Sequence, residues 1–572
     1  FTVTKEKENA ISIVTGNLIS ELLVDGEEGN TLTVSANSRK DFIVTLNNPN
    51  NRIARFNFYY VGDIPDGVDI DYIEEENYNT PPVETGINLE KVDTTGSSNT
   101  YIVRVANTTS SSVTITLGVS VGLDYNDLEL PANGHLLRKI ISTGTVSEVI
   151  EDDIMNNLNY EDSEQTFVTG SNPYNYIWYS GKLWRVMSID TSDNSVKLVT
   201  QWNISTISYD DNSSAFDGSY MEEWLNDTTI DGFLYNLREP EKFIKMDSKW
   251  NASQMSDTSK PPSEEEGGTI VEDAVGLLNI YEYNMSGASW LNNELNWLTL
   301  TSETTENIWY ISYTNAITNT FCSSQQGIRP SINLQSNITI IDGDGSEDNP
   351  YRLEGDNDTN LEGMLLNTRY SGEYVSFGTG DNNLYRIVSH ETEGLTKITS
   401  AEPLKENGTF KTLAFGDNKN YSSTNTIGSF LNGEYLDSGT YLTSEQINMV
   451  EDNIIWYLGI VGSAQSHLLG KYTDTNMSNL TSNTIIATIG LLRYGELMAG
   501  QFNIVCNNNN YWTLTPYQST TGVHRIASAG FSGTYASSAL FSIKPALNLK
   551  QNVIITSGDG TLQNPFNIEL SS

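Results

Sequence analysis

Short runs of alternating apolar and polar residues fill most of the first 121 positions of the chain. The clearest runs cover residues 32–34, 42–46, 54–60, 100–105 and 112–121. Alternation with a period of two, interrupted by turns rich in Gly, Asn and Pro, is typical of half-buried antiparallel strands. About seven such strands in about 120 residues predict an antiparallel β-sandwich. We assign it to residues 15–145.

A second pattern, with longer loops and a helix, follows the sandwich. Alternation over 177–189 and 196–200 predicts a pair of strands joined by a turn. Residues 219–226 have the spacing of a short amphipathic helix. After a long, weakly periodic stretch, apolar strands are expected at 297–301 and 328–334. Periodicity alone therefore predicts an α+β module with few helices.

The same module is present twice. The segment 328–334 (Ile-Arg-Pro-Ser-Ile-Asn-Leu) returns 215 positions later as 543–549 (Ile-Lys-Pro-Ala-Leu-Asn-Leu). Earlier landmarks keep their order while their spacing drifts, as expected when loops change length and core elements do not. Copies of roughly two hundred residues are much longer than solenoid repeats, so we predict tandem domains with separate cores. These two repeats are assigned to 165–356 and 361–572.

The chain is strongly acidic. Its 31 Lys and Arg residues stand against 73 Asp and Glu, which gives a net charge of −42. Such a surface repels phosphate backbones and anionic lipids, so we expect no nucleic-acid partner. Two interpretations of the charge stay open: it keeps the protein soluble, or it suits a secreted protein that lives among divalent cations. No run of about 18 apolar residues is present, so we expect no membrane span.

Two features bear on the cellular compartment. The chain starts at Phe1 rather than Met, which fits removal of an export signal, although a cloned fragment would start the same way. Its only cysteines are Cys322 and Cys506, and they do not match between the repeats. A disulfide between them would have to bridge two domains. Two unpaired, buried thiols are the alternative that we favour.

Two phrases in the sequence resemble a family of secreted proteins. Residues 15–18 (Thr-Gly-Asn-Leu), with the loop and strand pair that follow, look like the TasA/camelysin type of fibre protein. The phrase Trp-Thr-Leu-Thr-Pro at 512–516, which runs on to Phe566, resembles the closing modules of surface proteins from Gram-positive gut bacteria. The copy at 297–351 is looser and lacks the Pro.

This resemblance implies a fold and a location. It implies a TasA/camelysin-like N-terminal β-domain followed by two C-type-lectin-like or formylglycine-generating-enzyme-like repeat modules. The expected fold class is therefore mainly β with α+β modules: an antiparallel β-sandwich and then two tandem, homologous C-type-lectin-like domains. The expected location is extracellular, at the surface of a bacterial cell.

Candidate metal sites reduce to two glycine-rich turns, 342–345 and 557–560. Asp-Gly-Asp-Gly in the first copy resembles the start of a calcium loop, but it lacks the later acidic ligands and the flanking helices of an EF-hand. The second copy has Ser557 in place of the first aspartate. A tight hairpin that needs Gly at positive φ explains both copies. We therefore expect no metal site.

No catalytic arrangement stands out in the sequence. The four histidines, His135, His390, His467 and His524, have no Ser or Cys partner at a recognisable spacing. Nucleophile-elbow, zinc-protease and phosphate-loop motifs are missing from the sequence. Paired acidic residues are expected by chance in so acidic a chain. We therefore predict that the protein is not an enzyme and takes no cofactor.

Aromatic residues cluster where the first repeat begins: Tyr174, Tyr176, Trp178 and Tyr179. Three of them fall at every second position, so in a strand they share one face. If exposed, that face would form a platform for stacking on a sugar ring. If buried, the same side chains would pack the core of the strand pair, which is the interpretation that we favour.

The N-terminal segment 1–14 suggests how copies of the protein assemble. Phe1 and Val3 alternate with threonines, and Ile11, Ile13 and Val14 follow a charged linker. An exposed strand of this kind adds to an open sheet edge of another copy, and the TasA-like resemblance implies the same mode. A head-to-tail contact that does not close propagates as a filament. The other interpretation is that the segment forms the first strand of its own sandwich.

Two functional hypotheses follow. The leading one is a structural subunit of an extracellular filament, with copies of itself as partners and the apolar side chains of segment 1–14 at the subunit interface. The alternative is a cell-surface adhesin whose repeats bind a host glycan or a host surface protein.

Overall fold

The computed structural model shows a mainly β protein, with 43% strand and 11% helix, so the expected fold class is confirmed at this level. The structure describes residues 21–48, 54–60, 65–74, 88–92, 97–123, 165–168, 173–190, 193, 195–229, 232–256, 258, 269–286, 289–338, 340–343, 345–390, 394–437, 439–459, 483–493, 510–517, 521–530 and 532–571. By its contacts the chain divides into two compact units, which are 1–149 with 171–174 and 339–342, and 150–170, 175–338 and 343–572.

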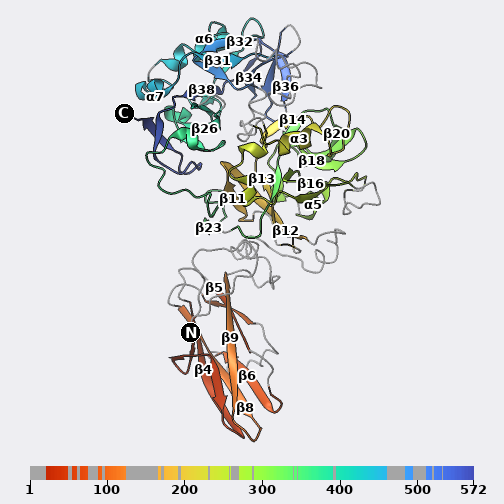
Figure 1. Cartoon of the computed structure of the whole chain (residues 1–572), viewed down its shortest axis with the longest axis vertical. Helices are drawn as coiled ribbons and strands as arrows, with labels where there is room; N and C mark the ends of the chain where they lie inside the picture. The colour runs from red at the N-terminus through yellow and green to blue at the C-terminus, as the bar shows by residue number, and fades with distance from the viewer. Residues whose placement is uncertain are drawn as a thin grey trace. The chain divides into compact units, whose positions relative to one another are not determined.

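The first unit contains two antiparallel sheets (Figure 1, red to orange). One has the order β2 (Glu27–Glu28), β1 (Glu21–Val24), β4 (Ser38–Asn48), β8 (Ser97–Asn107) and β6 (Val68–Glu74). The other has the order β3 (Thr31–Val34), β9 (Val113–Leu123), β5 (Ala54–Tyr60) and β7 (Asn88–Val92). The short strand β23 (Ile340–Asp342) is grouped with this unit.

Alternation along the strands gives the first unit its core. In β4, Phe42 and Val44 are buried, whereas Ile43 between them is 52% exposed. The second sheet contributes buried side chains from β3 and β9, among them Leu32 and Leu117. Both sheets therefore bury one face, as expected for layered β-structure.

The first repeat, in the second unit, contains two larger sheets. One has the order β17 (Val275–Gly276), β22 (Ser331–Leu334), β13 (Val196–Thr200), β12 (Lys182–Asp190), β11 (Tyr176–Tyr179) and β24 (Tyr351–Leu353), and β10 (Gln165–Phe167) also pairs with β12. The other has the order β14 (Ser205–Ile207), β21 (Gln326–Ile328), β18 (Trp297–Ser302), β19 (Asn307–Ile311) and β20 (Ile317–Phe321). The remaining elements are the pair β15 (Ser248–Asn251) and β16 (Ile270–Asp273), and the short helices α3 (Tyr220–Asn226), η1 (Leu234–Asn236), α4 (Pro240–Phe243), α5 (Ile280–Met285) and η3 (Ser289–Leu291).

The second repeat is built in the same order. Its first sheet is β33 (Ile489–Leu491), β38 (Pro545–Leu549), β27 (Thr396–Ser400), β26 (Leu384–Ser389) and β25 (Tyr374–Ser376). Its second sheet is β30 (Thr412–Ala414), β37 (Leu540–Ser542), β34 (Tyr511–Pro516), β35 (Gly522–Ile526) and β36 (Ser532–Ala536). The further elements are the strands β28 (Lys405–Glu406), β29 (Thr409–Phe410), β31 (Ile454–Tyr457), β32 (Thr484–Ala487), β39 (Val553–Ser557) and β40 (Asn567–Leu570), and the helices η4 (Leu366–Thr368), η5 (Gly380–Asn382), α6 (Thr426–Leu431), η6 (Glu434–Leu436) and α7 (Ser444–Met449).

The first predicted strand of the repeat, 177–189, is a hairpin and not one strand. Strands β11 and β12 pair antiparallel around a turn at Ser180 and Gly181, whose φ angles are 51° and 70°. Two central residues at positive φ are typical of the tight turns that fit the twist of a hairpin. The predicted helix at 219–226 is present as α3, and the Ser219 hydroxyl caps it by accepting from the Glu222 amide.

The glycine-rich turns have the backbone that was predicted for them. Gly343 and Gly558 lie at φ 83° and 93°. A Cβ on Gly343 would lie 2.8 Å from Tyr351 Cα, and one on Gly558 would lie 3.0 Å from Phe566 Cα. The left-handed conformation and the close backbone therefore both require Gly.

Candidate binding cleft between the two repeats

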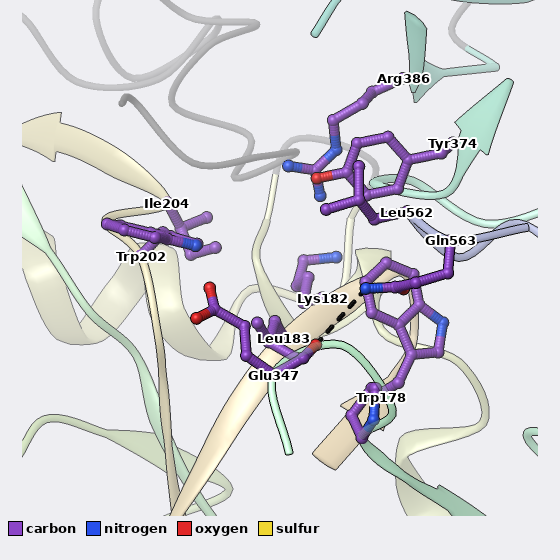
Figure 2. A pocket seen from close by; sticks show the side chains of 11 residues that line it. Trp178, Lys182, Leu183, Trp202, Ile204, Glu347, Tyr374, Arg386, Leu562 and Gln563 are labelled. Carbon is purple, nitrogen blue, oxygen red and sulfur yellow. Dashed lines mark hydrogen bonds between the residues drawn. The ribbon is translucent and has the colours of Figure 1, made fainter. Parts of the chain in front are cut away.

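A cleft of about 180 Å³ lies where the two repeats meet (Figure 2). Strands β11 and β12 and the loops that follow β13 and precede β24 form the side of the first repeat, with Trp178, Lys182, Leu183, Trp202, Ile204, Glu347 and Pro350. Strands β25 and β26 and the loop between β39 and β40 form the side of the second repeat, with Tyr374, Arg386, Leu562 and Gln563. The Gln563 amide donates to the Glu347 carbonyl at 3.5 Å across the rim.

Aromatic rings form much of the cleft wall. The Trp178 and Tyr374 rings, one from each repeat, lie 6.0 Å apart between centroids with a 31° angle between their planes. Trp202 is half-buried and lies on the other side of the view, with Lys182 between it and Tyr374 (Figure 2). Apolar walls with a few convergent polar groups are the usual lining of a small-molecule site.

Two cations at the cleft each donate to one backbone carbonyl of their own repeat and to one of the opposite repeat. Lys182 Nζ donates to Ser371 O at 3.2 Å and to Ser180 O at 3.1 Å. Arg386 donates to Gly181 O at 3.1 Å and to Gly372 O at 2.8 Å. Burial, and then the charge of Arg386, lowers the pKa of Lys182 to about 7. Burial also lowers the pKa of Arg386. The reciprocal bonds therefore bind the repeats together at the cleft.

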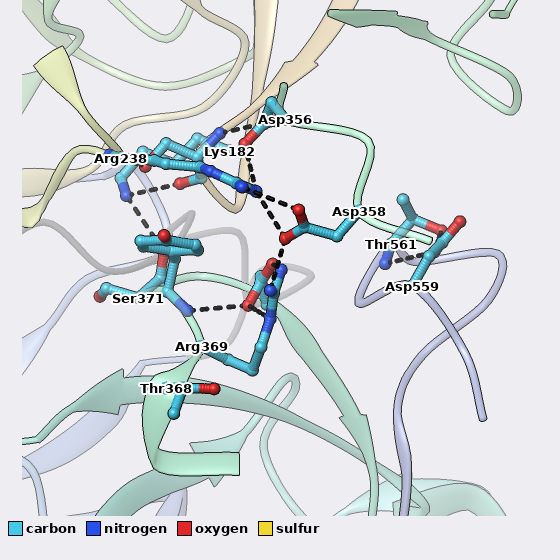
Figure 3. Close-up of polar contacts among 12 residues, drawn as sticks. Lys182, Arg238, Asp356, Asp358, Thr368, Arg369, Ser371, Asp559 and Thr561 are labelled. Carbon is cyan, nitrogen blue, oxygen red and sulfur yellow. Dashed lines mark hydrogen bonds and ion pairs between the residues drawn. The ribbon is translucent and has the colours of Figure 1, made fainter. Parts of the chain in front are cut away.

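An ionic cluster clamps the segment that links the two repeats (Figure 3). Arg238 of the first repeat donates two hydrogen bonds to Asp358, at 2.7 and 2.8 Å. Arg369 of the second repeat donates to the same carboxylate at 2.6 Å. Burial by itself raises the pKa of Asp358, but the bonds from Arg238 and Arg369 outweigh it and lower that pKa to about 2. A charged Asp358 therefore joins one arginine from each repeat.

Two further carboxylates of the cluster are more deeply buried. Asp356 accepts from the Ser180 amide at 3.2 Å and lies 3.5 Å from Arg238, yet burial raises its pKa to about 7. Glu373 accepts two bonds from Arg369, at 2.6 and 3.2 Å, and burial raises its pKa as well. Hydrogen bonds satisfy each of these groups, as buried charges require. The cluster therefore fixes the linking segment to both repeats through buried ionic contacts.

The sequence-predicted residues are distributed unevenly over the structure. The predicted interface residues Phe1, Val3, Ile11, Ile13 and Val14 all lie outside the described residues. His135, His467 and Cys506 lie outside them too. Cys322 is a buried thiol, whose pKa is raised by burial. His524 is buried within the second repeat, which lowers its pKa to about 4.

The aromatic cluster at the start of the first repeat is mainly a packing feature. Tyr176, Trp178 and Tyr179 are 6%, 4% and 0% exposed, so they do not form an open platform. The Tyr176 ring instead covers the Arg185 guanidinium at 3.8 Å. Trp178 packs in the core and also lines the cleft. The burial of these three side chains agrees with the interpretation that we favoured, which was core packing.

Sequence reasoning missed the residues that carry most of the cleft's polarity. Arg386 lies in Leu-Tyr-Arg-Ile at 384–387, which matches Leu-Trp-Arg-Val at 183–186 in the first repeat and by itself indicates only the repetition. Lys182 and Trp202 belong to no motif. Their only signal in the sequence is that Lys182 lies within one predicted strand region and Trp202 follows the next one. That position does not show which side chains of the other repeat they contact.

Neither a search for metal-binding groups and membrane helices nor a comparison with known proteins adds information about function. Within the described ranges, no three His, Cys, Asp or Glu side chains group together as a metal site would require. None of the described helices combines the length and the apolar character needed to cross a membrane. No protein-family model matches the chain, and neither a search of curated proteins nor one of solved structures returns a match.

Proposed function

We propose that the protein is an extracellular bacterial surface protein that binds a saccharide in the cleft between its repeats. The observation that carries the proposal is the meeting of aromatic rings and fixed hydrogen-bonding groups from both repeats around one cleft. A sugar ring has apolar C–H faces that stack on aromatic side chains and hydroxyl groups that need polar partners. Trp202, a half-buried ring, supplies the first kind of contact, and the more deeply buried Trp178 and Tyr374 line the wall of the cleft.

The size of the cleft favours a single terminal residue of a glycan. Because one water molecule takes about 30 Å³ of liquid, the cleft holds the volume of about six waters. That volume suits one ring and not a long chain. Leu562 at the rim is 49% exposed and lies where the rest of a glycan would leave the cleft.

The same proposal includes a fold assignment for the repeats. Each repeat has two separate sheets with a short helix, α3 or α6, beside them. This arrangement supports the C-type-lectin-like α+β class that the sequence resemblance implies.

Glycan binding by the full chain tests the proposal. A glycan array and calorimetry should show binding that weakens by about tenfold or more in Trp202→Ala, since a half-buried stacking ring is lost. Tyr313→Ala is a matched control, because Tyr313 is a 56% exposed aromatic residue of the first repeat that does not line the cleft. Absence of any bound glycan, or equal binding by Trp202→Ala, contradicts the proposal.

A filament subunit is the second candidate function. Within the described residues, β7 pairs only with β5, and β3 pairs only with β9. An open edge of this kind is where a strand from another copy adds. The predicted donor is segment 1–14, with Phe1 and Val3 entering side-chain pockets of the neighbouring copy.

Electron microscopy of the purified chain tests this second candidate. Long fibres are expected, and the double variant Phe1→Ser, Val3→Ser should abolish them because it removes the apolar face of the donor. Thr2→Ser with Thr4→Ser changes the opposite face of the same strand and should leave the fibres intact. If fibres persist after deletion of residues 1–9, the assigned donor segment is wrong.

A further inference from the structure

We propose that the saccharide taken by the cleft carries a carboxylate, as uronic and sialic acids do, and that Lys182 is the residue that recognises it. This inference rests on the proposed saccharide binding and adds the chemical class of the sugar. It starts from the charges that line the cleft. They are Lys182 and Arg386, both cationic, and Glu347, which is acidic.

Burial decides which of these charges dominates. Lys182 is 1% exposed and Arg386 is 4% exposed, whereas Glu347 is an exposed residue. A charge that is shielded from water acts more strongly on a ligand than one that water screens. In Figure 2 the Glu347 carboxylate points toward Trp202, away from the Lys182 ammonium. The two buried charged side chains that line the cleft are therefore both basic, in a protein whose net charge is −42.

The Lys182 ammonium has hydrogen-bonding capacity left for a ligand. It carries three N–H donors, and the described acceptors are two backbone carbonyls, Ser180 O and Ser371 O. The carbonyl oxygens fix the ammonium but carry no full negative charge. The third donor can be satisfied by a carboxylate, in a charge-assisted bond that is stronger than a neutral one.

The nearby acidic residues already have other partners. Glu373 accepts from Arg369, and Asp356 accepts from the Ser180 amide and lies beside Arg238. A buried cation whose direct partners are neutral carbonyls is costly to keep. A ligand carboxylate would offset this cost, with Arg386 as a second positive charge. A neutral sugar would not.

Pairs of sugars that differ only in the carboxylate test the inference with the full chain. The probes are methyl β-D-glucuronide against methyl β-D-glucoside, the corresponding galacturonide and galactoside, and N-acetylneuraminic acid against its methyl ester. In at least one pair the acid should bind about tenfold or more tightly, measured by calorimetry. If in every pair the neutral member binds as well as its acid, or if the array retains neutral or cationic glycans only, the inference fails while the proposed function stands. If no saccharide binds, the proposed function itself fails.

Two measurements assign the preference to Lys182. Lys182→Met should remove most of the acid-over-neutral ratio, and Lys249→Met, which changes an exposed lysine outside the cleft, should keep both the ratio and the neutral binding. In the wild type, calorimetry in two buffers at pH 7.5 should show proton uptake on binding of the acid, because the carboxylate restores the Lys182 charge. Asp356, Glu373, Arg386 and Glu347 also face this region, so the uptake must disappear in Lys182→Met. Uptake that persists there assigns recognition to another group and overturns the role of Lys182.

Discussion

The two repeats share their core and differ in the turn that follows the first strand. In the first repeat Ser180 and Gly181 close a tight turn between β11 and β12, whereas seven residues, 377–383, connect β25 and β26 in the second. A Cβ on Gly181 would lie 2.8 Å from Glu373 N and 3.0 Å from Gly372 C. The short turn thus presses against the second repeat. The contact between the repeats therefore involves a turn whose length differs between them, whereas the strand order of the sheets is the same in both.

The cores of the repeats are alike down to single contacts. Asn226 on α3 exchanges two hydrogen bonds with the backbone of Val275, and Asn432 after α6 does the same with Ile489. Each repeat also places a glycine of its first sheet against a buried tryptophan, and a lysine over the same ring. These sets are Gly276, Trp250 and Lys197, and Gly490, Trp456 and Lys397. Such shared contacts should be the least tolerant of change.

The largest expected effect comes from filling the space between glycine and tryptophan. A Cβ on Gly276 would lie within 2.7 Å of three ring atoms of Trp250, and one on Gly490 within 2.8 Å of three ring atoms of Trp456. We expect Gly276→Ala and Gly490→Ala each to lower the free energy of unfolding by about 3 kcal/mol through overpacking. Urea denaturation measures it. Gly533→Ala is the control, because its nearest neighbour is 4.0 Å away. Equal losses in all three variants would show that the tryptophan contact is not what matters.

One position at which the repeats differ should make the stability of the second repeat more sensitive to acid. Trp309 and His524 occupy the same place, since Thr299 and Thr513 donate to their respective carbonyls at 2.8 and 2.9 Å. Burial lowers the pKa of His524 to about 4, whereas an unfolded histidine titrates near 6.5. The folded state therefore binds fewer protons, so its stability is full above about pH 6.5 and falls as the pH drops toward 4.

The size of this loss can be measured against a variant that does not titrate. At pH 5 we expect the wild type to have lost about 2 kcal/mol of stability through His524 relative to pH 7. Urea unfolding of His524→Leu should show a pH dependence smaller by that amount. His390→Leu, which changes a less buried histidine of the same repeat, should not. An unchanged slope in His524→Leu would assign the acid sensitivity to other groups.

Sequence reasoning reached the local features and stopped where distant segments meet. Alternation located β3, β4, β5, β8 and β9, because each side-chain pattern repeats within one strand. It missed β1, β2, β6 and β7. It also merged β11 with β12, because a turn of Ser and Gly does not interrupt an apolar run. The cleft was out of reach. Lys182 and Arg386 lie in different repeats, and only packing of one repeat on the other brings both to the same cleft.

The smallest expected effect concerns Asp358 in the segment that links the repeats. Its carboxylate forms ion pairs with one arginine from each repeat, Arg238 and Arg369. The pKa of Asp358 is about 2 in the folded state, below the 3.8 usual for aspartate. A carboxyl with a lowered pKa stabilises the fold above the unfolded value, and this contribution is lost as the pH falls toward 2. Because the side chain is 27% exposed, solvent screening reduces the contribution to about 1 kcal/mol.

Asp358→Asn should therefore be about 1 kcal/mol less stable than the wild type at pH 7, and the difference should shrink between pH 4 and pH 2. Urea unfolding across that range measures it, with Asp381→Asn, at an exposed aspartate of the second repeat, as the control. A difference that stays constant with pH would mean that the introduced amide disturbs packing rather than charge. In that case the two arginines would join the repeats through their other contacts, with Tyr370 lying 4.9 Å from Arg238 and 5.2 Å from Arg369. A Tyr370→Leu variant would then show the larger loss.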